Sequence, residues 1–188
     1  VDLMLNVDPS VISTVKDDPN VQMLQTGASN SMTVSMWVDT APFDNPKVRE
    51  ALKLVVDRQA MVDTVLLGFG QPGADNPVPV SSPASYVKEA PKQDINKAKA
   101  LLAEAGYKAG LKFDLYTAEG VPGMVRMAQV FAEMAKPAGF DINVIVTPAE
   151  SYWDDVWLKK PIVTSAWSML PPGEGLAVAY TQNAKWKE

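Results

Sequence analysis

The sequence from Asp94 to Trp167 alternates three times between the apolar spacing of a helix and the apolar spacing of a strand. The predicted helices cover residues 94–106, 122–137 and 150–158, and the predicted strands cover residues 111–115, 142–146 and 162–167. Such alternation is typical of domains in which the strands form one sheet and the connecting helices pack on it. The sequence therefore predicts an α/β fold.

The first half of the chain carries its own helix and strand signals. A side chain that can cap a helix, followed by proline at the first helical position, predicts helices that begin after Asp8 and after Asn45. A capping aspartate and a terminal glycine predict a third helix over residues 57–68. Extended segments are predicted around residues 21–25 and 32–38, the second with its apolar side chains on one face.

Residues 68–91 are rich in glycine, proline, serine and asparagine, which predicts an irregular segment. Loops of this length are uncommon in compact domains unless they are functional or packed along a larger body. Gly68, Gly70 and Gly73 have the spacing of a dinucleotide-binding loop. That loop needs a strand before it and a helix after it, whereas a predicted helix precedes these glycines and prolines follow them. We therefore expect no nucleotide site here.

The composition excludes several classes of function. The chain has no cysteine and no histidine, so it can form no disulfide, no Ser-His or Cys-His catalytic pair and no metal site with nitrogen or sulfur ligands. The net charge is -5 and the basic residues are scattered, which argues against nucleic-acid binding. No apolar run is long enough to span a membrane. We expect no cofactor, no bound metal, no nucleic-acid partner and no direct membrane insertion.

Carboxylates are the main remaining material for catalysis. The adjacent pairs are Asp17-Asp18 and Asp154-Asp155, and the second lies in a predicted helix, where neighbouring side chains point in different directions. A solvated helix face is the simpler interpretation. The alternative function from another class is a carboxylate-dependent hydrolase that uses Glu150, Asp154 or Asp155. A third alternative is a chaperone-like protein that uses the proline-rich segment at 68–91.

Aromatic side chains are stronger candidates for a ligand site. Five of them lie near the ends of predicted strands or on the connection between the last two strands: Trp37, Tyr152, Trp153, Trp157 and Trp167. Strand ends in α/β domains are where ligands bind, although for any single tryptophan other than Trp167 packing in the core is the favoured interpretation. Trp167 stands apart because it closes a predicted strand and leads into a predicted loop at 168–173, whose backbone groups would be free to meet a ligand.

Several motifs resemble those of one protein family. The run from Ala41 to Leu52, continued by Val56-Asp57-Arg58 and Gly68-Phe69-Gly70, resembles the signature of the solute-binding proteins of ABC importers for peptides, dipeptides and nickel, known as extracellular solute-binding proteins of family 5. The stretch from Asp94 to Tyr107 resembles that family's "D-x-x-K-A-K-x-L-L-A-E-A-G-Y", and Gly139-Phe140 resembles the segment after its next helix. The likeness covers nearly the whole chain, in the right order.

The resemblance implies a fold and a function. It implies a periplasmic-binding-protein-like (class II) lobe with a mixed sheet and helices packed on it. Residues 1–188 would be a single domain, the second, C-terminal lobe of a two-lobe protein, truncated at both ends. The protein would be no enzyme but the substrate-binding component of an ABC importer, periplasmic or a cell-surface lipoprotein. It would capture a peptide or similar small solute between this lobe and the missing N-terminal lobe and deliver it to the membrane permease.

The resemblance also selects ligand-binding residues, namely Trp167, Ser168, Met169 and Trp37. Peptide-binding members carry an aspartate shortly after the tryptophan that matches Trp167, and it meets the α-amino group of the peptide. Here no acid follows before Glu174, so recognition of an amino terminus is not expected. Trp37 takes the place of an asparagine, and a tryptophan facing the cleft would suit a sugar or an atypical ligand as well as a peptide. Without histidine, the chain gives no support to nickel binding.

Overall fold

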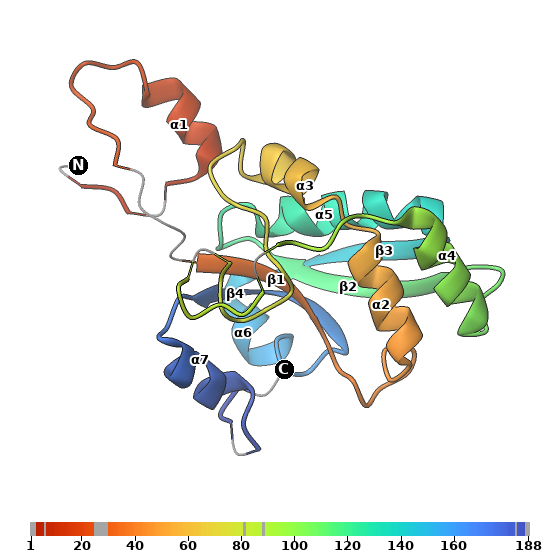
Figure 1. Ribbon diagram of the computed structural model, residues 1–188. Helices are drawn as coiled ribbons and strands as arrows, with labels where there is room; N and C mark the ends of the chain where they lie inside the picture. The colour runs from red at the N-terminus through yellow and green to blue at the C-terminus, as the bar shows by residue number, and fades with distance from the viewer. Residues whose placement is uncertain are drawn as a thin grey trace.

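The computed structural model describes residues 3–5, 7–24, 30–80, 82–87, 89–182 and 184–186. Within these ranges four strands form one sheet in the order β1-β4-β2-β3 (Figure 1). The strands are β1 (Asn30–Met36), β2 (Leu111–Ala118), β3 (Phe140–Thr147) and β4 (Ile162–Ser168). β2 is parallel to β3 and β4, and β1 is antiparallel to β4. The sheet is therefore mixed, and the predicted α/β fold is confirmed.

Helices cover both faces of the sheet. They are α1 (Pro9–Val15), α2 (Pro46–Leu54), α3 (Arg58–Val65), α4 (Ile95–Glu104), α5 (Met124–Ala135), the 3-10 turn η1 (Lys136–Ala138), α6 (Ala149–Asp155) and α7 (Pro172–Ala179). In Figure 1, α3 and α5 lie above the sheet, and α6 lies below it. The neighbours Ile162 and Val163 point to opposite faces of β4. Ile162 packs with α2, α4 and α5, whereas Val163 packs with Tyr152 of α6. None of the described helices is long and apolar enough to cross a membrane.

Short side chains cap four of the helices as the sequence predicts. Asp8, Asn45, Asp57 and Asp94 each accept a hydrogen bond from a backbone N–H in the first helical turn, at 2.8, 2.9, 3.0 and 2.9 Å. These bonds satisfy N–H groups that have no partner within the helix. The bonds from the Ser10 hydroxyl and backbone N–H also lower the pKa of the Asp8 carboxyl. The helix starts in the first half are therefore fixed by local sequence.

Two predicted strands differ from the structure. Residues 21–24 are irregular and exposed, so the strand predicted at 21–25 is wrong for these four residues. Gln25 lies outside the described residues. A strand needs a partner, and none of the described strands pairs with this segment. The strand predicted at 32–38 is present but ends at Met36, so Trp37 and Val38 follow it.

The segment after β4 also differs from the prediction of a loop at 168–173. Ser168 is the last residue of β4 and pairs with Asn30 of β1. The helix α7 then begins at Pro172. Two prolines and two glycines conceal this helix in the sequence, yet proline is well tolerated at the first helical position. Within residues 168–173, the irregular part is limited to residues 169–171.

The long segment at 68–91 has no helix or strand in its described part, as predicted. One side chain, that of Arg58, anchors it and is only 9% exposed. Arg58, at the start of α3, donates from Nη2 to both carboxylate oxygens of Asp75, at 2.9 and 2.7 Å. Its Nη1 donates to the carbonyl oxygen of Pro91 at 3.0 Å. The segment is therefore an irregular loop fixed to the body of the fold by Arg58.

Candidate functional site

The carboxyl ends of the three parallel strands meet at one edge of the sheet, and β4 extends beyond the others. Tyr116 pairs with Val163, so Ala118, the last residue of β2, lies level with Ser165, and β4 continues for three more residues. In α/β sheets this edge is where ligands bind. Trp167 and Ser168 are the last two residues of β4, and Met169 follows them. The structure thus places three of the four predicted site residues at the expected edge.

Trp167 belongs to a cluster of four tryptophans, here called the indole cluster: Trp153, Trp157, Trp167 and Trp186. The ring centroids of Trp157, Trp167 and Trp186 lie 6.1 Å from one another. Trp153 extends the cluster, 5.5 Å from Trp157, and is 42% exposed. The rings contact one another mostly edge to face, which is a favourable aromatic geometry. The cluster therefore holds Trp167 in one orientation beside an accessible aromatic surface.

The buried Tyr152 ties this cluster to the sheet. Its ring packs edge to face on Trp153 with centroids 5.1 Å apart, and its hydroxyl donates to the carbonyl oxygen of Thr164 in β4. The Thr164 hydroxyl in turn donates to the hydroxyl of Thr117 in β2 at 2.8 Å. Sequence reasoning identified Tyr152, Trp153 and Trp157 as candidates without placing them together. The structure shows that α6 and the turn after it bring them together.

Trp186 is the member of the cluster that the sequence analysis missed. It reaches the site because α7 turns the chain back, and its backbone N–H donates to the carbonyl oxygen of Val178 at 3.0 Å. The sequence gives no clear signal for this return, because the prolines and glycines at 171–175 conceal α7. Trp186 is far from Trp167 in the sequence, so no local pattern links the two residues.

Ser168 and Met169 occupy different environments. Ser168 belongs to the ladder with Asn30, so the expectation of a free loop backbone at this residue is wrong. Met169 lies in the irregular segment and is 44% exposed. It lines an open groove of about 430 Å³, here called the proline groove. The walls of the groove are Pro77, Val78, Pro79 and Ser82 on one side and Met169, Leu170, Pro171 and Pro172 on the other.

Trp37, the fourth predicted site residue, lies at the other end of the β1–β4 ladder. Its backbone N–H donates to the carbonyl oxygen of Pro161 at 2.9 Å, whereas Trp167 pairs with Ser31. Trp37 lies six positions after Ser31, which corresponds to about 20 Å along an antiparallel strand. The structure therefore does not bring Trp37 next to Trp167, and a role for Trp37 in ligand binding stays a prediction.

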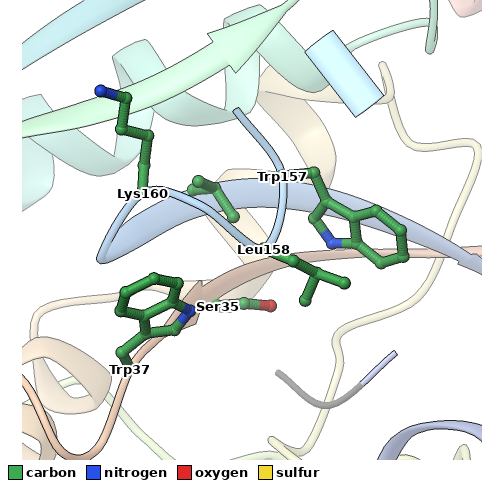
Figure 2. Close-up of a pocket in the computed structure, with 6 residues that line it drawn as sticks. Ser35, Trp37, Trp157, Leu158 and Lys160 are labelled. Atoms are coloured by element: carbon green, nitrogen blue, oxygen red, sulfur yellow. The ribbon is translucent and has the colours of Figure 1, made fainter. Parts of the chain in front are cut away.

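Trp37 lines a small cavity. Ser35, Trp157, Leu158, Lys160 and Val163 complete its lining, and its volume is about 10 Å³. Figure 2 shows the Leu158 side chain between the indoles of Trp37 and Trp157, with the Lys160 side chain pointing away. A cavity of this size holds roughly one water molecule. The cavity is thus too small for a solute as it stands.

The acids considered for catalysis are all on the surface. Glu150, Asp154 and Asp155 are exposed, as are Asp17 and Asp18. The buried polar side chains of the described residues are hydroxyls, those of Ser85, Thr117, Thr164 and Ser165. In the same part of the chain no group of three or more acids is arranged to hold a metal ion. None of these five candidate carboxylates is sheltered from solvent.

Comparisons with known proteins agree with the fold. The family model for bacterial extracellular solute-binding proteins, family 5 Middle, matches residues 1–186. Heme-binding protein A of Haemophilus influenzae is 35% identical over 161 residues, which cover 82% of this chain and 28% of that protein. Nickel-binding protein NikA of Staphylococcus aureus is 33% identical over 151 residues, which cover 77% of this chain and 30% of that protein.

A solved structure has the same fold. The periplasmic binding protein DppA from Helicobacter pylori, in complex with the peptide STSA, matches with a TM-score of 0.80 at 21% identity. The match covers 90% of this chain and 33% of DppA. This chain therefore spans about a third or less of the length of the proteins it matches.

Proposed function

Because the chain belongs to the bacterial extracellular solute-binding proteins of family 5, we propose that it forms part of the substrate-binding component of an ABC importer. One observation carries the proposal. Trp167, Ser168 and Met169 meet at the carboxyl edge of the sheet beside the indole cluster and the proline groove. The surface position of the described acids favours binding over hydrolysis.

Each residue at this edge has a proposed role. Trp167, held by Trp157 and Trp186, offers a rigid apolar surface for the ligand to pack against. The backbone at Met169, which lies outside the β-ladder, is free of sheet pairing and provides hydrogen-bonding groups. Ser168 contributes its exposed side chain at the tip of β4. Trp37 would contact the solute only if the ligand or the opposing lobe reached the far end of the ladder.

The whole protein is proposed to have two lobes, of which residues 1–188 supply the second. A solute bound between the lobes would favour the closed form, because only that form lets both lobes contact it. The closed protein would then deliver the solute to the membrane permease. The family consists of extracellular and periplasmic solute-binding proteins, and we place this protein in the periplasm or at the cell surface as a lipoprotein.

The solute is proposed to be a peptide or a similar small molecule. Relatives are named for heme, for nickel and for di- and tripeptides, so the family relationship leaves several ligand classes open. The chain has no histidine for nickel and no acid between Trp167 and Glu174 for a peptide amino group. We therefore propose a solute held on this side by apolar and backbone contacts.

Native mass spectrometry tests this function. The protein is measured as purified and again after denaturation and refolding, and we expect an additional small-molecule mass that only the first sample carries. The released solute should stay chemically intact when it is incubated with the protein for hours. A protein that carries no solute, or one that degrades it, would contradict the binding function, and degradation would favour the hydrolase.

A further inference from the structure

The proline groove brings together two segments that are far apart in sequence. One wall comes from the loop at 68–91 and the other from the residues that join β4 to α7. Its volume of about 430 Å³ lies within the range of small-molecule sites, roughly 300–1,000 Å³. It is therefore large enough to take part of a solute.

The chemistry of the lining is uniform. Seven of the eight lining residues are apolar, and none is ionisable. The eighth, Ser82, accepts a hydrogen bond at its hydroxyl oxygen from the backbone N–H of Ala84 at 3.2 Å. Four of the eight are prolines, which have no backbone N–H to offer. An ionised group placed here would lose water without gaining a partner, whereas an apolar group would be stabilised by burial.

Both walls are held in place before any ligand binds. On the loop side, the Ser85 hydroxyl donates to the carbonyl oxygen of Val87 at 2.7 Å, and Arg58 fixes Asp75. On the other side, the backbone N–H of Gly175 donates to the carbonyl oxygen of Pro171 in the first turn of α7. A preformed site binds more tightly because little conformational freedom is lost on binding.

The groove shares one residue with the proposed ligand site, since Met169 lines it and lies two residues after Trp167 in the sequence. We infer that the proline groove binds an uncharged, apolar part of the solute, while the adjoining edge at Trp167 binds the remainder. This inference rests on the proposed function and specifies the solute class. The solute would have an uncharged, apolar group at the end that this lobe binds.

The experiment uses N-phenyl-1-naphthylamine, an uncharged apolar dye whose emission rises when it leaves water. The dye is titrated into the chain and into three variants. Leu170→Glu places a charge in the groove, Leu170→Met keeps the residue apolar at similar volume, and Leu24→Glu places the same charge on an apolar residue outside the groove. Leu24 is 81% exposed and Leu170 is 38% exposed, so neither substitution disturbs a core.

We expect one saturable dye site that Leu170→Glu weakens at least tenfold and that Leu170→Met and Leu24→Glu change by less than about twofold. Dye binding that responds to Leu24→Glu but not to Leu170→Glu would overturn the inference. Native mass spectrometry of Leu170→Glu separates the two proposals. If neither the wild-type protein nor any variant carries a solute, the proposed importer function is wrong. If Leu170→Glu carries as much solute as the wild-type protein, only the inference about the proline groove is wrong.

Discussion

At the scale of single residues, two arginines in the motifs that carry the family resemblance have structural roles. Arg49 donates from Nη1 to the carbonyl oxygens of Phe43 and Asp44, at 2.7 and 3.0 Å, and so fixes the turn before α2. Arg58 links α3 to Asp75 and Pro91 of the long loop. The signature that carries the family resemblance therefore marks the scaffold, whereas the proposed ligand residues lie at the end of β4.

Removing the Arg58 guanidinium should loosen the loop that forms one wall of the proline groove. The side chain is only 9% exposed, and Asp75 is 29% exposed. We expect Arg58→Met to lower the free energy of unfolding by roughly 2–3 kcal/mol, somewhat less than for a fully buried pair. Urea denaturation followed by circular dichroism measures the change.

The matched control is Lys47→Met, which breaks the exposed ion pair between Lys47 and Glu104. It should cost less than about 1 kcal/mol, since exposed pairs contribute little. Equal losses for the two variants would show that the Arg58 contacts do not hold the loop.

At the scale of elements, prediction succeeded where the determinants are local. Asn45 and Asp94 cap their helices through neighbours two and three residues away, which a sequence pattern can reveal. The errors arose where the determinants are distant. Residues 21–24 have the pattern of a strand but no partner among the described strands, and α7 places Trp186 beside Trp167 through a return of the chain that no local pattern indicates.

The segment before β1 should contribute little to the stability of the body. None of the described residues 3–5 and 7–24 belongs to either core cluster, and within α1 only Pro9 is buried. We expect Met23→Glu to change the free energy of unfolding by less than about 0.5 kcal/mol, as is usual for surface sites. In the same urea titration, Leu115→Ala should cost about 2–5 kcal/mol because Leu115 is fully buried in the core. A comparable loss from Met23→Glu would show that this segment is packed in solution.

At the scale of the whole molecule, the sheet has two unlike ends. The carboxyl end of the parallel strands carries Trp167 with the indole cluster and the proline groove. The opposite end carries Trp37 beside a cavity of about 10 Å³, which Trp157 of the indole cluster also lines. Both tryptophans were predicted as site residues because each lies near the end of a predicted strand and at a position that the family resemblance selects. The sequence could not show that they lie at opposite ends, because antiparallel pairing of β1 with β4 sets that separation.

Calorimetric titration of the solute identified by mass spectrometry tests the central claim, that the carboxyl edge at Trp167 binds the ligand. We predict that Trp167→Ala weakens binding at least tenfold, about 1.4 kcal/mol, and weakens it more than Trp37→Ala does. Trp167→Phe should retain part of the affinity, and urea denaturation confirms that each variant is folded. Wild-type affinity in a folded Trp167→Ala variant, or an equal loss with Trp37→Ala, would contradict the assignment of the site to this edge.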